Sequence, residues 1–259
     1  MSKIHQFISY ISYWLNEENE HSLHAPFIYD LYKKVIKKKY KEDRAYKSIE
    51  QVRKGFLDSE KSITIHDFGS GSNNASDRKI SKIAQYGISR KSFSQLFDSL
   101  INYLEATEII ELGTSLGVNT LYLANGEHRN VTTFEGAPAL CAIAQAVFDG
   151  NGKTNIKIVE GDINTTLPDY LERITKVDLA FIDANHKYQP TLQYFDWLLK
   201  KAHDKTCFVF DDIHRNKEME AAWRKLNESY EVALSIDLYQ VGLVFINPEL
   251  RKQSYTLKF

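Results

Sequence analysis

From residue 108 onward, short apolar runs alternate with longer segments of helical spacing. The apolar runs occupy residues 109–112, 131–134, 156–159, 177–182 and 207–210. Helical patterns fill the gaps, at residues 118–124, 139–148, 167–174, 191–200 and 218–229. Near-continuous apolar strands separated by helices are typical of a parallel sheet that is covered on both faces. The pattern predicts an α/β domain with a Rossmann-like sheet flanked by helices.

The end of the chain departs from this alternation. Residues 230–236 and 238–246 are two strand-like runs with only Asp237 between them. This gap is too short for a crossover helix, so we expect the two runs to pair as an antiparallel hairpin. Five parallel strands followed by such a hairpin argue against the dinucleotide-binding domain of a dehydrogenase.

The first hundred residues are charged and helical in pattern. A first helix has one apolar face, made of Ile4, Phe7, Ile8, Ile11 and Trp14. A second helix is expected after Pro26, and its other face is basic, with Lys33, Lys34, Lys37, Lys38, Lys39 and Lys41. We interpret the basic face as solvated, and a phosphate- or RNA-binding face is the alternative.

A glycine-rich segment at residues 67–74, Asp-Phe-Gly-Ser-Gly-Ser-Asn-Asn, superficially resembles a nucleotide-binding loop. The residues after it are polar and basic, and no second strand ending in an acid follows at a suitable distance. We therefore expect a flexible loop or lid. The chain is divided into a helical N-terminal extension, residues 1–91, and a domain at residues 92–259 that opens with an amphipathic helix at residues 92–103.

Composition narrows the functional classes. The chain has 259 residues, 43% of them hydrophobic, and a formal net charge of -1, which argues against a dominant nucleic-acid or membrane partner. No apolar run approaches the ~20 residues that span a bilayer, and no secretion signal is recognisable. Cys141 and Cys207 are interpreted as packing residues. A reduced, cytoplasmic setting is expected, and the oligomeric state is left open, with a homo-oligomer among the alternatives.

The strongest functional signal is the turn after the first apolar strand, Leu112-Gly113-Thr114-Ser115-Leu116-Gly117. The next strand ends in Glu135. Glycines allow close approach of the backbone to a ligand, and a carboxylate can accept hydrogen bonds from ribose hydroxyls, so a nucleoside site is expected here.

Acidic residues follow every strand of the predicted sheet. They are Glu111, Glu135, Glu160 with Asp162, Asp183, and Asp211 with Asp212. Because the carboxyl ends of parallel strands share one edge, mutual repulsion must be offset by a ligand or a cation. We interpret this edge as functional.

From about residue 92 to residue 246, the chain resembles class I S-adenosylmethionine-dependent methyltransferases of the catechol O-methyltransferase-like group. The resemblance lies in Glu111 with the glycine turn, in Phe134-Glu135-Gly136-Ala137-Pro138, in Phe181-Ile182-Asp183 and in Phe210-Asp211-Asp212. The final hairpin matches the family's reversed last strand. Residues before 92 lie outside the resemblance.

The resemblance implies roles for the cofactor-side residues. Glu111, Gly113, Ser115 and Gly117 would line the methionine and ribose side of S-adenosylmethionine. Glu135, followed by Gly136, would hold the ribose hydroxyls, Asp162 and Ile163 would frame the adenine, and Asp183 would orient the cofactor. The turn lacks the Gly-x-Gly-x-x-Gly spacing of a pyrophosphate site, which disfavours a nicotinamide cofactor.

The resemblance also implies a divalent metal, such as Mg²⁺, bound by Asp183, Asp211 and Asp212. Carboxylate oxygens suit Mg²⁺, and an acceptor with two adjacent hydroxyls could chelate it. Catechol-type enzymes have Asp-Asn where this chain has Asp211-Asp212, whereas related sugar O-methyltransferases have paired aspartates. The alternative is that Asp183 orients the cofactor and that Asp211 and Asp212 cap the following helix.

His186 lies near the position of a basic lysine in catechol-type enzymes and is a candidate general base, and Asp183 is a second candidate catalytic residue. The sequence therefore predicts an O-methyltransferase that acts on a small-molecule hydroxyl with metal assistance. The rival is a methyltransferase-like module that binds RNA or protein through the basic helix. A nicotinamide-dependent oxidoreductase is disfavoured.

Overall fold

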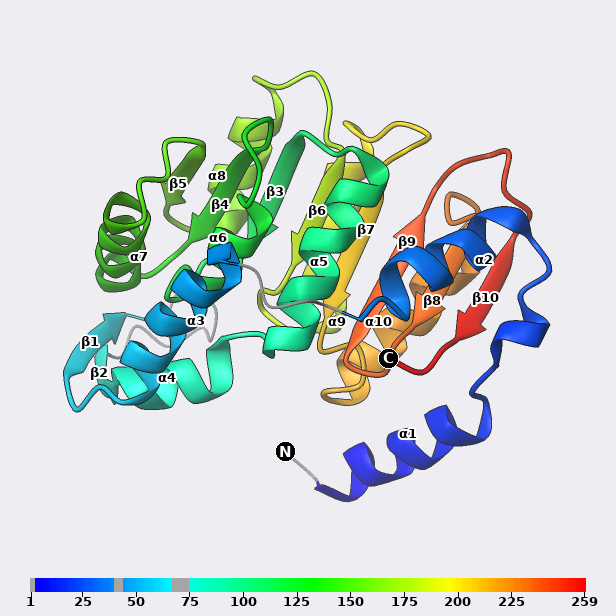
Figure 1. Ribbon diagram of the computed structural model, residues 1–259, viewed down its shortest axis with the longest axis horizontal. Coiled ribbons are helices and arrows are strands. Elements are labelled where there is room, and N and C mark those ends of the chain that lie inside the picture. The colour runs from blue at the N-terminus through cyan, green and yellow to red at the C-terminus, as the bar shows by residue number, and fades with distance from the viewer. Residues whose placement is uncertain (1–2, 40–43, 67–74) are drawn as a thin grey trace. The chain divides into compact units, whose positions relative to one another are not determined.

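A computed structural model describes residues 3–39, 44–66 and 75–259 (Figure 1). The chain forms two compact units. One unit comprises Met1–Lys38 and Ile174–Phe259, and the other comprises Lys39–Arg173. The predicted division near residue 91 does not coincide with these bounds and stays a prediction. The expected loop at residues 67–74 and the expected basic residue Lys41 lie outside the described residues.

The 39–173 unit contains three parallel strands in the order β3-β4-β5. They are β3 (Glu108–Leu112), β4 (Asn130–Glu135) and β5 (Ile156–Glu160). Helices α6 (Val118–Leu123), α7 (Pro138–Gly150) and α8 (Ile163–Leu171) follow them in turn. The predicted alternation of strand and helix is confirmed. The apolar runs form strands because side chains on both faces of β3 and β4 are buried.

Preceding segments complete this unit. They are α3 (Arg44–Leu57), β1 (Ser62–His66), β2 (Ala75–Lys79), α4 (Ile80–Gly87) and α5 (Lys91–Leu104). Strands β1 and β2 pair as an antiparallel hairpin that the sequence pattern did not predict. Ile65 and Ile80 from this region pack with Leu116 of the glycine turn and with Leu140 of α7. The hairpin therefore supports the turn that was predicted to bind the nucleoside.

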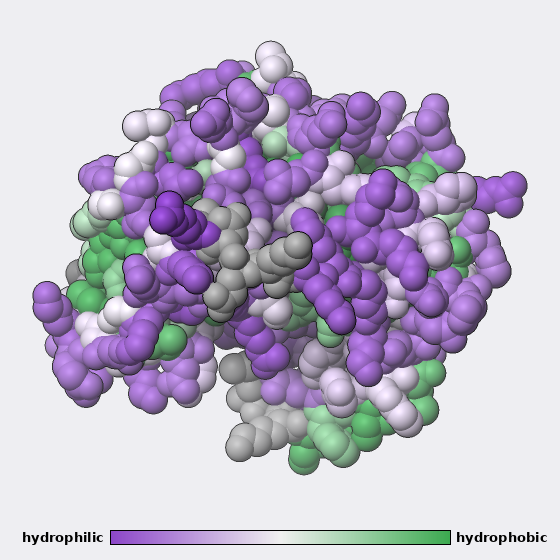
Figure 2. Space-filling view, in the orientation of Figure 1, coloured by the Kyte–Doolittle hydropathy of each residue, from purple (hydrophilic) through white to green (hydrophobic). Residues whose placement is uncertain are grey.

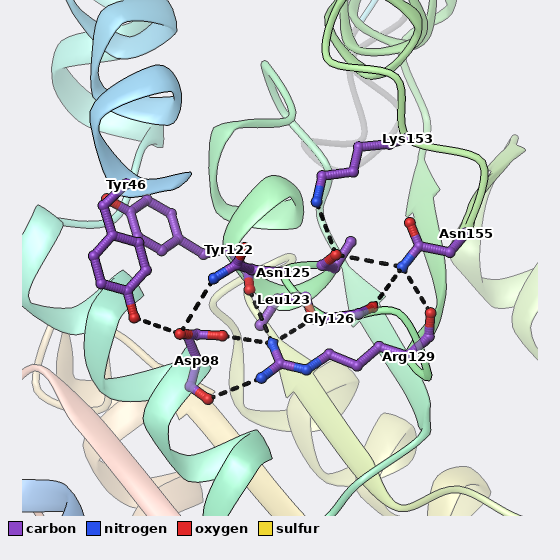
Figure 3. Close-up of polar contacts among 10 residues, drawn as sticks. Tyr46, Asp98, Tyr122, Leu123, Asn125, Gly126, Arg129, Lys153 and Asn155 are labelled. Atoms are coloured by element: carbon purple, nitrogen blue, oxygen red, sulfur yellow. Dashed lines mark hydrogen bonds and ion pairs between the residues drawn. The ribbon is translucent and has the colours of Figure 1, made fainter. Parts of the chain in front are cut away.

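A buried ion pair between Asp98 of α5 and Arg129 joins several elements of this unit (Figure 3). Arg129 Nη1 donates to Asp98 Oδ1 at 2.6 Å and also to the backbone oxygen of Leu123 at 3.0 Å. The Tyr46 hydroxyl, from α3, donates to the same carboxylate. Helices α3, α5 and α6 are thereby fixed to the segment that enters β4.

The 1–38 and 174–259 unit has five strands in the order β10-β8-β9-β7-β6. They are β6 (Leu179–Ile182), β7 (Cys207–Asp211), β8 (Leu234–Asp237), β9 (Val241–Phe245) and β10 (Gln253–Thr256). Strands β6 and β7 are parallel, whereas β9 is antiparallel to both β7 and β8. Helices α9 (Tyr188–Leu199) and α10 (Lys217–Glu228) accompany them. The predicted C-terminal hairpin is confirmed.

Two details of this sheet differ from the expectation. The hairpin turn is longer than the single residue Asp237, because Asp237 ends β8 and its Oδ1 accepts a hydrogen bond from the Tyr239 amide at 2.7 Å. Tyr239 has a φ of 67° in that turn. Strand β10, which pairs in parallel with β8, was not predicted because its alternation is short and mostly exposed.

The N-terminal helices belong to this second unit. Helix α1 spans Lys3–Leu15, and α2 (Pro26–Leu31) continues into a π-helical turn, η2 (Tyr32–Ile36). Both predicted helices are confirmed. Ile28, Leu31 and Val35 are buried, whereas the predicted apolar face of α1 is exposed. In the part of the chain that the structure describes, no helix is long and apolar enough to cross a membrane.

The ion pair between Asp98 and Arg129 generates a stability prediction. Arg129→Leu should lower the free energy of unfolding by about 3–5 kcal/mol, because the carboxylate of Asp98 stays buried without its cation. Lys54→Leu is the matched control, since Lys54 pairs with Asp58 on an exposed surface and should change stability little. Chemical denaturation measures both, and equal losses would contradict the assigned role of Arg129.

Candidate functional site

The turn after β3 adopts backbone conformations that suit glycine. Gly113, Ser115 and Gly117 have φ values of 101°, 50° and 77°. The amides of Gly113 and Thr114 donate to the backbone oxygen of Phe134 at 3.0 and 3.2 Å, which ties the turn to β4. A Cβ at Gly117 would lie 2.7 Å from the Phe148 ring, so only glycine lets α6 and α7 pack this closely.

Glu135, at the end of β4, faces this turn. Its Oε2 accepts a hydrogen bond from the Ser115 amide and its Oε1 accepts one from the Ala137 amide, each at 2.9 Å. Glu135 is partly buried, and its carboxylate is held in place by these two backbone amides. Such a group can accept hydrogen bonds from ligand hydroxyls at the turn.

Glu111, at the end of β3, is fully buried. Its carboxylate accepts hydrogen bonds from the Thr120 hydroxyl at 2.5 Å, the Thr133 hydroxyl at 2.7 Å and the Asn119 amide at 3.0 Å. Burial raises the pKa of Glu111 to about 7, although these hydrogen bonds oppose the shift. In this arrangement Glu111 joins β3, β4 and α6 beneath the turn. Its predicted contact with the cofactor stays a prediction.

The third strand end completes the cofactor-side set. Asp162 is exposed and caps α8, accepting a hydrogen bond from the Asn164 amide at 2.9 Å. Ile163 is partly buried at the first position of that helix. Gly161, with a φ of 133°, donates from its amide to the backbone oxygen of Glu135 at 2.9 Å. Gly136 follows Glu135 at the same strand end.

The structure therefore brings eight of the predicted cofactor residues to the carboxyl ends of three parallel strands. Leu112 pairs with Phe134, and Glu135 pairs with Glu160, so these strand ends are in register. The residues are Glu111, Gly113, Ser115, Gly117, Glu135, Gly136, Asp162 and Ile163. Parallel sheets bind ligands at this edge.

The acceptor-side candidates lie in the other unit, after β6 and β7. Asp183 directly follows β6, and its Oδ1 lies 3.4 Å from His186 Nε2. Asn185 and His186 both have positive φ values, 66° and 44°. The backbone oxygen of His186 accepts a hydrogen bond from Asn216 at 3.1 Å. These contacts hold the imidazole beside the carboxylate.

Asp211 ends β7 and is buried, and its Oδ1 has no hydrogen-bond partner among the described residues. Burial, together with the neighbouring charge of Asp212, raises the pKa of the Asp211 carboxyl to about 8. Asp212 has a φ of 57° and binds Arg215 Nη1 through its Oδ2 at 2.5 Å. Burial and then the Arg215 charge lower the pKa of His186 to about 4, so its imidazole is neutral at pH 7.

Arg215 was missed by the sequence reasoning, although its spacing of three residues from Asp212 was a signal. Arg215 is the last residue of a local turn, because its backbone amide donates a hydrogen bond to the Asp212 backbone oxygen at 2.9 Å. Its guanidinium therefore lies close to the Asp212 carboxylate. It brings positive charge to a group of residues that was expected to need a cation.

The expected metal ligands Asp183, Asp211 and Asp212 lie at the carboxyl ends of the neighbouring strands β6 and β7. Among the described residues, no group of three or more His, Cys, Asp or Glu side chains could hold a metal ion. Asp212 is paired with Arg215, and Asp183 with His186. A divalent ion would compete with Arg215 for Asp212, so we assign no chemical step to a metal, and the Mg²⁺ site stays a prediction.

The buried carboxyl of Glu111 generates a pH prediction. The pKa is about 7 in the folded chain against an ordinary 4.5. The folded state therefore holds a proton that the unfolded chain releases. This contribution to stability is complete below pH 4.5 and is lost as the pH rises through about 7.

Across that pH range, the wild type should lose on the order of 2–3 kcal/mol relative to Glu111→Gln, whose amide does not titrate. Denaturant unfolding of both proteins over a pH series measures the difference. Parallel stability curves would contradict the buried, protonated carboxyl.

Known methyltransferases are similar to the part of the chain that contains these residues. Residues 110–213 match a family model described as a methyltransferase domain. The catechol O-methyltransferase of Niastella koreensis is 32% identical over 121 residues, which are 45% of this chain and 54% of that relative. The catechol O-methyltransferase of Mycobacterium tuberculosis is 28% identical over 119 residues, covering 45% and 52%. The chain spans about half the length of the curated relatives that it matches.

Solved structures share the fold at low identity. An SAH-bound methyltransferase from Podospora anserina has a TM-score of 0.61 and 13% identity, covering 87% of this chain and 97% of that chain. The O-methyltransferase from Bacillus cereus in complex with SAH has a TM-score of 0.54 and 18% identity, covering 79% and 92%.

The family match and the fold together confirm the resemblance that the sequence predicted. Residues 110–213 match the model of a methyltransferase domain, and the chain shares the Rossmann-like fold of solved SAH-bound methyltransferases.

Proposed function

We propose that this protein is an S-adenosylmethionine-dependent O-methyltransferase that acts on the hydroxyl group of a small molecule. The observation that carries the proposal is the position of Glu135 at the glycine turn, inside the segment that matches the methyltransferase domain. A carboxylate that accepts hydrogen bonds at such a turn suits the hydroxyls of a ribose. The cytoplasmic setting expected from composition stays a prediction.

The cofactor-side residues fit a nucleoside. Gly113 has a positive φ and is only partly buried, so a ligand can approach its backbone closely. Glu135 would accept hydrogen bonds from the ribose, while Asp162 and Ile163 would border the adenine. Glu111 would act from below by holding the turn in place. When bound, S-adenosylmethionine would supply a methyl group on a positively charged sulfur.

The acceptor-side residues can remove a proton. The Nε2 atom of His186 lies beside Asp183, so the tautomer that is protonated on Nε2 leaves Nδ1 to accept a proton from the acceptor hydroxyl. Burial and the Arg215 charge oppose an imidazolium at this position, so the Asp183 carboxylate beside Nε2 would have to supply the compensating stabilisation. The guanidinium of Arg215 would favour the negatively charged acceptor oxygen. When bound, the cofactor would supply the methyl group as its S–C bond is broken, the acceptor oxygen would form the new O–C bond, and His186 would hold the proton released from the hydroxyl.

The acceptor is proposed by analogy with the relatives. Two of them are named catechol O-methyltransferase, so an aromatic compound with two adjacent hydroxyls is the first candidate, followed by a sugar diol. The predicted Mg²⁺ site is not needed for the proton transfer described above.

The RNA- or protein-binding alternative has weaker support. Its basic helix contains Lys33, which pairs with Glu20 at 2.6 Å, and Lys34, which pairs with Asp30 at 3.0 Å. Lysines that are paired with acids contribute less to a phosphate-binding surface. A steep loss of RNA binding on raising the salt concentration would favour this alternative.

Binding of the cofactor tests the proposal. Glu135→Gln should weaken the affinity for S-adenosylhomocysteine about 10- to 100-fold in calorimetry, because a charge-assisted hydrogen bond is lost. The matched control is Glu172→Gln, which makes the same charge change at an exposed residue after the C-terminal end of α8 and should leave the affinity unchanged. Absence of any heat from S-adenosylmethionine or S-adenosylhomocysteine with the wild type would overturn the proposed function.

Activation of the acceptor needs a separate test. With a diol acceptor, formation of S-adenosylhomocysteine should continue in the presence of a chelator. His186→Ala should lower kcat by about 10²–10⁴ because the general base is lost. His24→Ala removes an exposed histidine of the same unit and serves as the control. If the chelator abolishes activity and Mg²⁺ restores it, the metal prediction is correct and the base assignment is wrong.

A further inference from the structure

Helix α1 turns its polar side toward the protein. The Tyr13 hydroxyl donates to the backbone oxygen of Leu257 at 2.7 Å, and the Ser9 hydroxyl donates to Glu220 at 3.4 Å. The Gln6 amide donates to the backbone oxygen of Arg215 at 3.4 Å. In a helix of a monomeric protein, the polar side normally faces water. Here the polar side is the docked side.

The opposite side of α1 is apolar and exposed. We call it the α1 face and define it by Ile4, Phe7, Ile8, Ile11, Trp14 and Leu15, which are 40–70% exposed, with Tyr10 at its border. The spacing of three and four residues places them on one stripe. Figure 2 shows green side chains gathered at the bottom of the view, where Figure 1 places α1.

The α1 face has the size of a protein interface. Its residues expose roughly 800 Å², more than the largest apolar patch of a typical monomer, about 300–600 Å². A stable interface buries about 800 Å² on each partner. The α1 face alone is therefore large enough for one side of a specific complex.

Charge and spacing identify the occupant of this face. Residues 4–16 contain no Lys, Arg, Asp or Glu. A helix that lies on a membrane carries basic residues on a wetted polar face, whereas the polar side of α1 is bonded to protein. Depletion of charge with enrichment of aromatic residues is typical of the core of a protein interface.

The same spacing makes the face complementary to itself. Ile4, Ile8, Ile11 and Leu15 alternate by four and three residues, which is the apolar seam along which two helices pack knobs into holes. Two identical uncharged faces meet across a twofold axis without repulsion between like charges.

We propose that the α1 face binds the α1 face of a second copy of this chain and makes the protein a symmetric dimer. The Arg215 segment contacts the opposite side of the same helix, so the dimer contact would not cover it.

The test measures the mass of the full-length protein in solution by light scattering over a concentration series. The wild type should have twice the 29.9 kDa mass of the chain. Ile8→Asp places a charge at the centre of the face and should weaken dimerisation at least tenfold. Tyr230→Asp is the control, because Tyr230 is also fully exposed in the same unit but lies outside the face, and it should remain dimeric.

A cross-linking experiment provides a second readout. Cysteines introduced singly at Ile4, Ile8, Ile11 and Leu15 should include at least one that forms a disulfide between copies, and both native cysteines are buried. A monomeric wild type, a dimeric Ile8→Asp variant or a complete lack of cross-links would overturn the proposal. Flotation of a monomeric wild type with anionic phospholipid vesicles would instead assign the face to a lipid surface. Binding of S-adenosylhomocysteine, measured on the same samples, tests the proposed function independently.

Discussion

Two carboxylates determine the shape of the glycine turn. Glu111 binds the hydroxyls of Thr120 and Thr133 below the turn, and Glu135 binds the Ser115 amide from the side. Ser115 is held at a positive φ that a residue with a side chain rarely adopts. Hydrogen bonds of this kind compensate for the cost of that conformation. The position of α6 depends on this local arrangement, because the helix begins directly after the turn.

Negative charge at the strand ends is handled differently in the two units. In the 39–173 unit, hydroxyl and amide donors satisfy the carboxylates. In the other unit, Asp212 and Asp183 are paired with the cationic or polar side chains of Arg215 and His186. An internal guanidinium is always protonated and cannot be removed by a chelator. The chain thus carries its own counter-charge at the edge where the resemblance led us to expect a metal.

Much of the fold could be predicted from the sequence, because buried parallel strands appear as short apolar runs between helices. The five runs from Ile109 to Phe210 became strands, and the C-terminal hairpin was recognised from the short gap at Asp237. The β1–β2 hairpin and β10 were missed, since their residues are polar or exposed and carry little periodic signal. The predicted hairpin turn was too short, because a hydropathy pattern does not reveal the hydrogen bond from the Tyr239 amide to the Asp237 side chain.

The sequence predicted which residue types form the candidate site, but it did not predict the contacts that these residues make. Glu135 was recognised because an acid follows an apolar strand. The burial of Glu111, however, depends on Thr120 and Thr133, which only the folded structure brings together. Likewise, the spacing of Ile4 to Trp14 predicted a helix with an apolar face, but not that this face points outward. Periodicity defines the two sides of a helix and leaves open which side the rest of the protein covers.

The hydrogen bond from Gln6 to the Arg215 backbone links α1 to the turn that contains Asp212. When binding at one site changes the affinity at another, the effect is reciprocal. A ligand that shifts the Asp212–Arg215 turn also shifts the acceptor of the Gln6 hydrogen bond; if this changes the free energy of whatever α1 binds, occupancy of α1 changes the affinity for that ligand by the same factor. Self-association and acceptor binding would then be two measurements of a single coupling energy.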